Sequence, residues 1–352
     1  MLIDNDNYYH YNVCILYTWG ERHLLHIKKY LRITLLLLLI STLFLSGCGI
    51  GERTIGTQRD SNADKSGERA SEHSISIPNE AGETTIIGEP KKIAVLNWQL
   101  ADFLLALDIK PYAMTNLMGE TNLEYLEKDA LEGVIDLGDK PNLEVLSQSN
   151  PDLIIGWESR REIVDQLTKI APTILTKEND DWRKSLQELG SMLGKNKEAE
   201  EWLAQYDQKA TASMQLLTSK IDPTETVLYM RVMPKVLRIY SSTQSLGATL
   251  SQDTGLQYLP QTESIQNFEN ISIEQLPELN PDHIFIQIGR PLRGGDQEAK
   301  KIYEELTQSS IWNNMKAIKN KQVYTVPHWI ISDAPHIKEK SIDLVLEKLG
   351  VN

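Results

Sequence analysis

An uninterrupted helical pattern at residues 197–221 constrains the fold more than any other part of this sequence. It contains no glycine or proline, and Pro223 ends it. Apolar residues recur there at steps of three and four, which is the spacing of one helical face: Ala199, Trp202, Leu203, Tyr206, Ala210, Met214, Leu217 and Ile221. Alternating strand and helix patterns lie on both sides. The stretch is therefore interpreted as a strut between two α/β lobes or, equally, as a crossover helix within one larger α/β domain.

A short motif occurs once on each side of this helix and favours the two-lobe interpretation. Glu144 precedes Asn150-Pro-Asp by six residues, and Glu274 precedes Asn280-Pro-Asp by the same number. Each copy predicts a helix that begins at its glutamate, ends before the proline and leads into a buried strand. The shared spacing indicates duplication or two similarly built lobes. The alternative is chance, because Asn-Pro-Asp turns are common before buried strands.

Charge and composition limit the size and the partners of the protein. The 352-residue chain is 41% hydrophobic, which is enough for two cores of ordinary size. Its net charge is −13. Binding to nucleic acid requires a basic face that neutralises phosphates, so nucleic acid is not expected as a partner.

The N-terminal 47 residues carry the features of an export signal. Three basic residues precede an apolar run at residues 33–45, which is too short for a comfortable membrane span. The sequence Leu45-Ser-Gly-Cys48 resembles the lipobox of bacterial lipoproteins, in which the signal is removed before an acylated cysteine. We therefore expect residues 1–47 to be a signal peptide, with a plain membrane anchor as the alternative. The long segment before the signal indicates a true translation start near His26.

The segment after the signal is expected to be a lipid-anchored tether. Cys48 is the only cysteine beyond the signal, so no intramolecular disulfide or cysteine-rich metal site can form there. Residues 48–88 are polar, with hardly any apolar side chains before Ile75, which predicts a flexible tether. These features place the folded part at the extracytoplasmic face of a cell membrane, anchored through Cys48.

The remaining chain is predicted to form an N-terminal α/β lobe at 89–195, a bridging helix at 196–222 and a C-terminal α/β lobe at 223–352. Strands and helices alternate in both lobes, which predicts mostly parallel sheets whose ligands lie beyond the carboxyl ends of the strands. Strands are expected at 92–97, 112–115, 134–137, 152–156, 172–176, 226–232, 236–240, 283–288 and 322–326. Helices are expected at 99–107, 142–149, 162–170, 246–253, 297–306 and 341–349.

Motifs for catalysis or for binding a bare metal ion are absent from the sequence. It contains no Gly-x-Ser-x-Gly, phosphate-binding glycine loop with lysine, His-Glu-x-x-His or dinucleotide fingerprint. The histidines beyond the tether are scattered, and His283 at a strand start is interpreted as a packed or capping residue. We therefore expect a protein that is not an enzyme and that needs neither a cofactor nor a resident metal.

Aromatic and cationic residues follow the predicted strands, where a ligand would bind. The first lobe offers Trp98, Lys140, Trp157, Arg160 and Arg161, and the second offers Arg231, Arg290, Arg293, His328 and Trp329. The guanidinium fork binds two oxygens of an oxyanion, and tryptophan provides a flat apolar wall. Any one of these residues could equally be an ordinary surface or half-buried side chain. Together they indicate an anionic, partly apolar or aromatic ligand.

Several short motifs recur in a characteristic order from Pro90 to the C-terminus. They are Lys92-Ile-Ala-Val-Leu, Ala106-Leu-Asp-Ile-Lys-Pro, Lys140-Pro-Asn-Leu-Glu, Asn150-Pro-Asp-Leu-Ile-Ile, the strut, Ser245-Leu-Gly-Ala-Thr-Leu, Thr254-Gly-Leu, Ile271-Ser-Ile-Glu-Gln-Leu, Pro281-Asp, Trp312 and Ala317-Ile-Lys-Asn-Lys-Gln-Val-Tyr. Their order and spacing resemble those of the substrate-binding lipoproteins of iron-siderophore ABC importers, a family that includes vitamin B12 and haem binders. The resemblance implies two Rossmann-like lobes bridged by one long helix, the class III periplasmic-binding-protein architecture, with little hinge closure on binding.

The resemblance also implies partners and docking residues. In that family a glutamate on each lobe docks into arginine pockets of the two permease subunits, and the matching residues here are Glu144 and Glu274. A pair of like residues related by pseudo-symmetry suits a two-fold permease dimer. The alternative is that each glutamate only favours the N-terminus of its helix. We expect the protein itself to be a monomer.

The class of ligand is left open between several siderophores. Hydroxamate-binding members usually carry an arginine where this chain has Gly138. Lys140, with Arg160 or Arg161 and with Arg231, resembles the basic triad of catecholate-binding relatives, and citrate-type siderophores also suit many cations. An iron(III)-siderophore complex of catecholate or citrate type is therefore expected as the ligand. The alternatives are a cobalamin or haem binder of the same fold, an extracytoplasmic enzyme and a sensor without transport.

Overall fold

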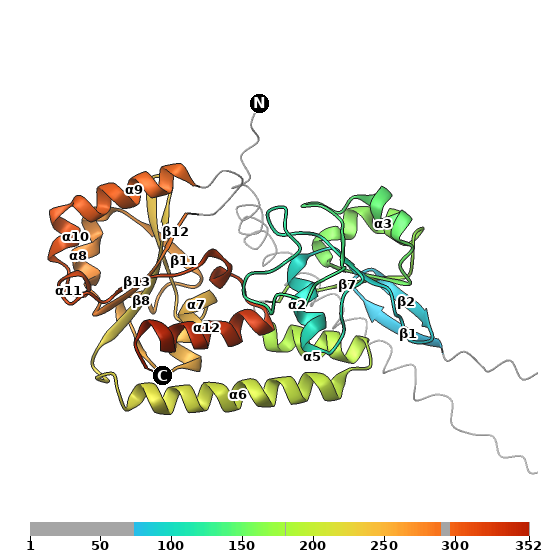
Figure 1. The fold of residues 1–352 in the computed structure, drawn as a ribbon, viewed down its shortest axis with the longest axis horizontal. Helices are drawn as coiled ribbons and strands as arrows, with labels where there is room; N and C mark the ends of the chain where they lie inside the picture. The colour runs from blue at the N-terminus through green and yellow to red at the C-terminus, as the bar shows by residue number, and fades with distance from the viewer. Residues whose placement is uncertain (1–73, 180, 290–295, 352) are drawn as a thin grey trace, which may run out of the picture. The chain divides into compact units, whose positions relative to one another are not determined.

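The computed structural model describes residues 74–179, 181–289 and 296–351. Figure 1 shows two sheets, each with its own helices, and the long helix α6 (Asn196–Thr218) that runs from one to the other. The buried face of α6 contains Ala199, Leu203, Tyr206, Ala210 and Leu217, as the sequence pattern predicts. The strut interpretation is confirmed, because the elements before and after α6 form separate sheets.

The first sheet has five parallel strands in the order β5-β4-β3-β6-β7. Its strands are β3 (Ile93–Val95), β4 (Ala113–Met114), β5 (Ile135–Asp136), β6 (Leu153–Trp157) and β7 (Thr173–Thr176). The helices between and after them are α2 (Trp98–Ala106), α3 (Leu143–Ser149), η2 (Glu158–Ile163), α4 (Val164–Leu167) and α5 (Trp182–Met192). The chain adds strands on one side of β3 and then crosses to the other side, so β3 and β6 flank the point where the strand order reverses.

The second sheet has the order β11-β9-β8-β12-β13, with β10 paired to the start of β8. Its strands are β8 (Thr226–Met233), β9 (Val236–Tyr240), β10 (Gln257–Tyr258), β11 (Phe268–Ile271), β12 (His283–Ile288) and β13 (Val323–Thr325). The prediction of a mostly parallel sheet holds for three of the five strand pairings, while β9 pairs antiparallel with both β8 and β11. The two residues between β8 and β9 can form only a hairpin, since a parallel crossover needs a dozen or more residues.

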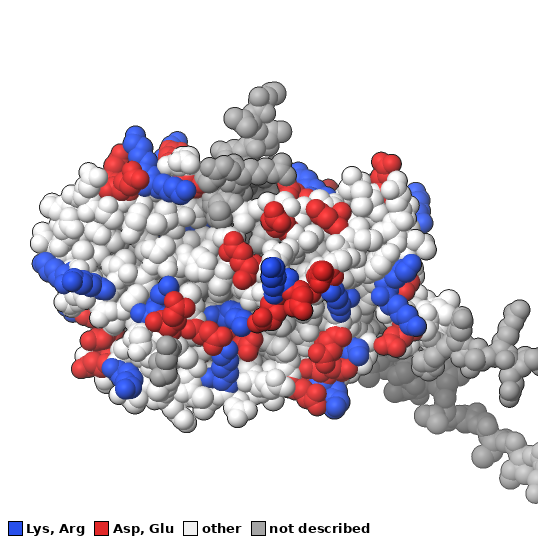
Figure 2. Space-filling view, in the orientation of Figure 1, with Lys and Arg blue, Asp and Glu red and all other residues white. Residues whose placement is uncertain are grey.

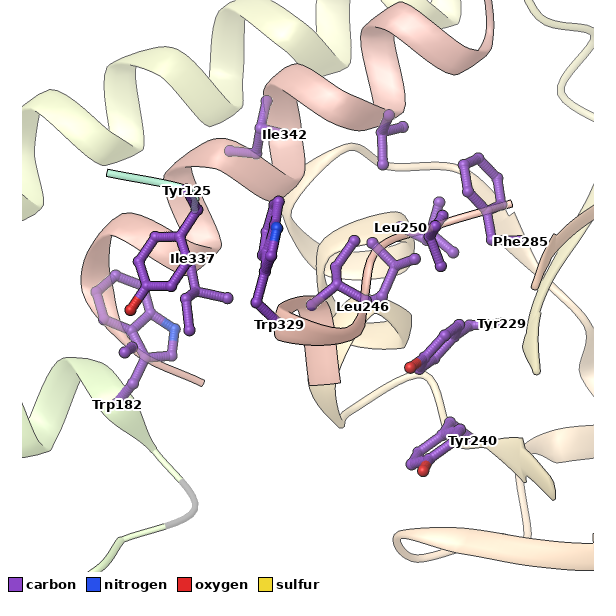
Figure 3. Packing of buried hydrophobic residues seen from close by; sticks show 14 of the residues in the cluster. Tyr125, Trp182, Tyr229, Tyr240, Leu246, Leu250, Phe285, Trp329, Ile337 and Ile342 are labelled. Atoms are coloured by element: carbon purple, nitrogen blue, oxygen red, sulfur yellow. The ribbon is translucent and has the colours of Figure 1, made fainter. Parts of the chain in front are cut away.

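Ten short or medium helices accompany the second sheet. They are α7 (Ser245–Ala248), η3 (Thr249–Asp253), η4 (Pro260–Thr262), η5 (Ile273–Gln275), α8 (Leu276–Leu279), α9 (Gln297–Gln308), α10 (Ser310–Asn314), α11 (Lys316–Lys319), η6 (His328–Ile331) and α12 (Pro335–Lys348), counted over the described residues. Helix α12 begins six residues before the expected start, because Pro335 occupies its first turn, where a missing N–H costs nothing. Figure 3 shows residues of α7, η3, η6 and α12 packed together in the core.

A β-hairpin replaces the end of the predicted tether. Strands β1 (Ser74–Asn79) and β2 (Gly82–Ile87) pair antiparallel and bury Ile77 and Ile86. The Thr84 hydroxyl donates to the Thr173 carbonyl at 2.6 Å, so the hairpin covers the edge strand β7. The prediction of a tether as far as residue 88 is therefore wrong for residues 74–88. Their isoleucines alternate with polar residues, which is a signal for a strand. The sequence analysis missed this signal because it considered only the polar composition of the whole segment.

The repeated Asn-Pro-Asp motif has a structural role at the same place in both sheets. Asn150 and Asn280 both end their helices in the left-handed conformation. The Asp152 carboxylate accepts from the backbone N–H groups of Lys91 and Lys92, just before β3. The Asp282 carboxylate accepts from the N–H of Thr226, where β8 begins. Each motif thus ends a helix and fixes the start of the central strand beside it, which supports duplication of the unit.

Contacts of helix α12 tie the two lobes together beside α6. The buried Asp102 of α2 accepts from the backbone N–H of His336 at 2.9 Å and pairs with its Nδ1 at 2.8 Å. The His336 ring also packs against Trp202 of α6, with ring centroids 5.7 Å apart. Burial would lower the pKa of His336, but the hydrogen bond and charge of Asp102 outweigh burial and raise it.

None of the helices in the described part of the chain combines the length and the apolar character that a membrane crossing requires. Figure 2 shows acidic and basic side chains interspersed over the face in view, without a large patch of either sign.

Replacing His336 by Gln is expected to change the pH dependence of stability. A histidine whose folded-state pKa is raised stabilises the fold below its unfolded-state pKa of about 6.5, and this contribution is lost as the pH rises through the folded-state pKa. The free energy of unfolding of the parent should therefore be higher than that of His336→Gln. The difference should be largest at acidic pH and smallest at alkaline pH. Urea unfolding of both proteins between pH 5 and 9 measures this.

The matched comparison is His328→Gln, for which the opposite sign is expected. Burial lowers the pKa of His328, so this histidine disfavours the fold at acidic pH. A difference between parent and His336→Gln that stays constant with pH would show that the Asp102 pair carries no charge-dependent stabilisation.

Candidate functional site

A pocket of about 580 Å³ opens beyond the carboxyl ends of β3 and β4 in the first lobe. Its wall consists of residues that follow β3, β4, β5 and β6: Leu96, Asn97, Trp98, Thr115, Asn116, Leu117, Met118, Asp139 and Arg160. The strand order reverses between β3 and β6, and open α/β sheets bind their ligands at such a switch point. The topology therefore identifies this pocket as the candidate ligand site of the first lobe.

The side chain of Asn116 is held rigidly in the pocket wall. Its Nδ2 donates to both carboxylate oxygens of Asp136, at 2.9 and 3.0 Å. Its Oδ1 accepts from the backbone N–H of Gly119, and the backbone N–H of Asn116 donates to the Gly138 carbonyl. This part of the wall is thus preformed, which limits the ordering cost that binding a ligand would carry.

Trp98 and Arg160 give the pocket its apolar wall and its positive charge. Trp98 is half-buried in the first turn of α2, which Asn97 caps by accepting from the N–H of Gln99. Arg160 lies in η2, directly after β6, and makes no hydrogen bond or ion pair with another described residue. Asp139, which also lines the pocket, adds a negative charge. The pocket is therefore part apolar and part charged, with one guanidinium available to a ligand.

Arg161 lies beside Arg160 in sequence but is not among the residues that line this pocket. Its guanidinium pairs with Glu80 at 3.0 Å, and Lys177 reaches the same carboxylate at 3.5 Å. Glu80 belongs to the turn of the β1–β2 hairpin, which lies against β7. The hairpin, which the sequence analysis assigned to the tether, thus engages Arg161, whereas Arg160 lines the pocket.

The other predicted residues of the first lobe are placed differently. Trp157 is buried and packs edge-on against Phe103, with ring centroids 6.1 Å apart. Lys140 is exposed and makes no hydrogen bond or ion pair with another described residue, and it does not line this pocket. Glu144 is exposed in the first turn of α3, where it accepts from the Gln148 amide at 3.3 Å.

In the second lobe the predicted residues Trp329, Arg231 and His283 are all buried. Trp329 is buried against Tyr125 of the first lobe, with ring centroids 5.4 Å apart (Figure 3). Arg231, on β8, is only 1% exposed. The burial of His328 and the positive charge of Arg231 lower the pKa of His328, whereas the negative charge of Glu124 raises it. The predicted role of His283 is confirmed: it is buried and pairs with Glu225 at 2.8 Å.

Three predicted functional residues lie outside the described residues, namely Arg290, Arg293 and the lipidation residue Cys48. Glu274, the partner of Glu144 in the repeat, is exposed in η5. A hydrogen bond with Ser272 lowers the pKa of Glu274. Both docking candidates thus stand exposed in the first turn of equivalent helices, and they remain predictions. Within the described ranges, no group of three or more His, Cys, Asp or Glu residues could hold a metal ion.

Polar residues of the pocket wall were missed by the sequence analysis. Asn97, Thr115 and Asn116 follow β3 and β4 just as Trp98 does, but only aromatic and cationic residues were considered there. The strand-end rule alone could have identified them. Their contacts could not be predicted, because Asp136, which orients Asn116, is 20 residues away in sequence.

A family model for periplasmic binding proteins matches residues 93–328, which is more than half of the chain. The chain belongs to the periplasmic binding protein family.

Curated relatives and solved structures agree with this membership. The chain is 29% identical to the Fe(3+)-citrate-binding protein YfmC of Bacillus subtilis (strain 168), covering 82% of this chain and 86% of that one. It is 28% identical to the probable siderophore-binding lipoprotein YfiY of the same organism, covering 88% and 94%. The crystal structure of Staphylococcus aureus SirA complexed with staphyloferrin B superimposes with a TM-score of 0.67 at 30% identity, covering 79% of this chain and 99% of SirA. The predicted fold class is confirmed.

Arg160→Gln is expected to weaken ligand binding by this periplasmic binding protein, whereas Arg161→Gln should not. A hydrogen bond to a charged group contributes about 1.5–3 kcal/mol, so the loss of Arg160 should raise the Kd roughly 10- to 150-fold. Loss of the exposed Arg161–Glu80 pair costs about 0–1 kcal/mol of stability and removes no residue of the pocket. Titration of both variants with the ferric siderophore that the parent binds measures the two effects. Equal losses for the two variants would remove Arg160 from the ligand site.

Proposed function

We propose that this protein is an extracytoplasmic receptor that binds a ferric siderophore and delivers it to the permease of an ABC importer. The observation that carries the proposal is the preformed pocket at the switch point of the first sheet, with Trp98 as an apolar wall and Arg160 as an available cation. Ferric siderophores combine an anionic metal centre with apolar or aromatic arms, which such a pocket suits. Membership of the family and the names of the relatives support the same assignment.

Within the siderophores, a citrate or catecholate type is favoured. One relative is named as an Fe(3+)-citrate-binding protein, and the solved structure of SirA contains staphyloferrin B. The charge of the ferric complex is expected to be bound by arginines rather than by side chains that coordinate the metal, so iron enters as part of the cargo. No catalytic step, cofactor or second subunit is required for this function, and we propose a monomeric, non-enzymatic receptor.

A ligand screen by tryptophan fluorescence tests the proposal. The probes are ferric citrate, ferric staphyloferrin B, ferri-bacillibactin and ferrioxamine B, each beside its iron-free form, together with haem and cobalamin. We expect quenching by at least one ferric siderophore and weaker binding of its iron-free form, because iron organises the donor oxygens into one compact anion. The variant Trp98→Phe should reduce the signal and so place the ligand in the pocket. If haem or cobalamin is the only ligand that binds, the protein is a tetrapyrrole receptor and not a siderophore receptor.

The location of the receptor is proposed from its N-terminal segment. The lipobox-like sequence at Leu45–Cys48 and the naming of a relative as a lipoprotein support removal of the signal and anchoring through a lipid on Cys48. Cell fractionation of a Cys48→Ser variant measures this, and a processed variant that stays with the membrane would contradict it.

Glu144 and Glu274 are proposed to dock the receptor onto the two permease subunits. Both are exposed in the first turns of equivalent helices, and neither lines the pocket. Glu144→Ala and Glu274→Ala should each leave siderophore affinity near the parent value and reduce iron uptake, and the double variant should reduce it further. An exposed carboxylate at a helix start contributes only about 0.3–1 kcal/mol to stability, so folding should be preserved.

The matched control is Glu278→Ala, because Glu278 is exposed in α8, directly after η5, but is not part of the repeat. Affinity is measured on purified protein and uptake in cells that carry the same variants. Normal uptake by the double variant would assign both glutamates a structural role, and an equal fall in affinity and uptake would place them in the ligand site.

A further inference from the structure

A buried carboxylate lies one helical turn behind the pocket of the first lobe. Helix α2 begins with Trp98 in the pocket wall, and the fully buried Asp102 follows four residues later on the same helical face. Asp102 is the only charged residue of α2, whose other side chains are apolar apart from Gln99. Apolar packing is non-directional, whereas hydrogen bonds to a carboxylate have a defined geometry. Asp102 can therefore fix the position of α2.

His336 holds this carboxylate from helix α12 of the second lobe. The backbone N–H of His336 and its ring Nδ1 both contact Oδ1 of Asp102, at 2.9 and 2.8 Å. The ring is half-buried, so protons from the solvent can reach it. Within the described ranges, His336 is the only cationic side chain that pairs with Asp102.

The second oxygen of Asp102 receives no compensation from its surroundings. Oδ2 of Asp102 and the Tyr125 hydroxyl are both buried, and neither makes a hydrogen bond in the described part of the chain. Burial and the charge of Asp102 raise the pKa of Tyr125, so this hydroxyl stays neutral. A buried charge that loses its only partner is strongly destabilising. The carboxylate therefore depends on the positive charge of His336.

Lys338 fixes the same turn of α12 to the rest of the second lobe. It is fully buried, and its Nζ donates to the Ser245 carbonyl at 3.0 Å and pairs with Asp333 at 3.2 Å. Residues two apart in a helix point about 200° apart around its axis, so His336 and Lys338 face opposite sides. The first turn of α12 is thus held to α2 on one side and to the start of α7 on the other.

The charge of His336 is set mainly by Asp102. Burial opposes protonation of the ring, but Asp102 and then Glu339 favour it, and together they outweigh burial and Lys340 and raise the pKa of His336. In η6, His328 interacts with Glu124 and Arg231. Charged groups on the other elements that pack against α12 pair away from His336: Lys209 with Asp343, Arg183 with Asp207, and Asp253 with Lys338.

We propose that Asp102 and His336 form a proton-dependent latch that positions α2, so that the protein binds its ligand more tightly when the His336 ring is protonated. This inference rests on the proposed function and adds control by pH to it. With the ring protonated, the ion pair holds α2 where Trp98 and Asn97 complete the pocket wall. When the ring releases its proton to the solvent, the buried carboxylate loses its counter-ion and the contact between α2 and α12 weakens. A smaller fraction of molecules then has a complete pocket, and the apparent affinity falls by the same factor.

The test uses Asp102→Asn, with Asp343→Asn as the matched control. The amide oxygen in Asp102→Asn can still accept from the N–H groups of His336 but carries no charge. Asp343→Asn also removes one negative charge beside α12, where Asp343 pairs with Lys209 of α6 at 2.7 Å rather than with α2. Kd values are measured by tryptophan fluorescence between pH 6 and 8.5 with ferric citrate, ferric staphyloferrin B and ferri-bacillibactin. The ratio of variant to parent Kd at each pH cancels the titration of the ligand itself, and circular dichroism checks folding.

A second measurement needs no folded variant of Asp102. Histidine-selective NMR follows the pKa of the His336 ring in the parent, with and without the gallium(III) complex of the siderophore that binds, because paramagnetic ferric iron would broaden the signals. Linkage is reciprocal, so a ligand that binds the protonated form about threefold more tightly must raise the pKa of His336 by about 0.5.

We expect the Kd ratio of Asp102→Asn to parent to be at least about threefold higher at pH 6 than at pH 8.5, and the pKa of His336 to rise on binding. The ratio for Asp343→Asn should stay constant with pH. A constant ratio for Asp102→Asn, the same trend in Asp343→Asn, or an unchanged pKa of His336 would each overturn the latch and leave the receptor function intact. A parent that binds no ferric siderophore would overturn the proposed function and this inference with it.

Discussion

The site depends on where the central strand of each sheet begins, and one carboxylate sets that position in each lobe. Asp152 holds the backbone just before β3 and Asp282 holds the start of β8, each through backbone N–H groups. A shift of one residue in either strand would move its side chains to the opposite face. Leu96 to Trp98 would then leave the pocket, and Arg231 would turn to the opposite face of the second sheet. The repeat that marks the two lobes in the sequence therefore also sets the position of the pocket residues on the first sheet and of Arg231 on the second.

The sequence predicted the strut, the two lobes and most strands, because these depend on local periodicity and on turn residues. It failed where a distant segment decides the outcome. The β1–β2 hairpin alternates like a strand, but only its contacts with Thr173 and Leu175 of β7 distinguish it from a polar tether. The same hairpin engages Arg161 through Glu80, so the choice between two consecutive arginines could not be made from their own positions.

The second lobe shows the same limit for the site. Arg231 was identified because it lies near the end of a predicted strand, whereas Arg238 was overlooked because it lies inside the next one. The two residues are seven apart in sequence, and they become opposite only because β9 turns back on β8. The general prediction of mostly parallel strands did not single out β9 as the antiparallel one, although a two-residue link between β8 and β9 permits nothing but a hairpin.

Among the described residues, Nη1 of the buried Arg231 has no hydrogen-bond partner, and an unsatisfied buried group commonly costs about 1–3 kcal/mol of stability. The fold tolerates this because the lobes are held by contacts elsewhere: Asp102 with His336, Arg183 of α5 with Asp207 of α6, and Tyr125 against Trp329. None of these contacts uses the Arg231 guanidinium, which stays fixed by the Gly289 carbonyl. An arginine paired with an internal carboxylate would have to break that ion pair before it could bind an anion. An arginine without such a pair, held in a rigid sheet, does not carry this cost and would therefore contribute more to the free energy of binding.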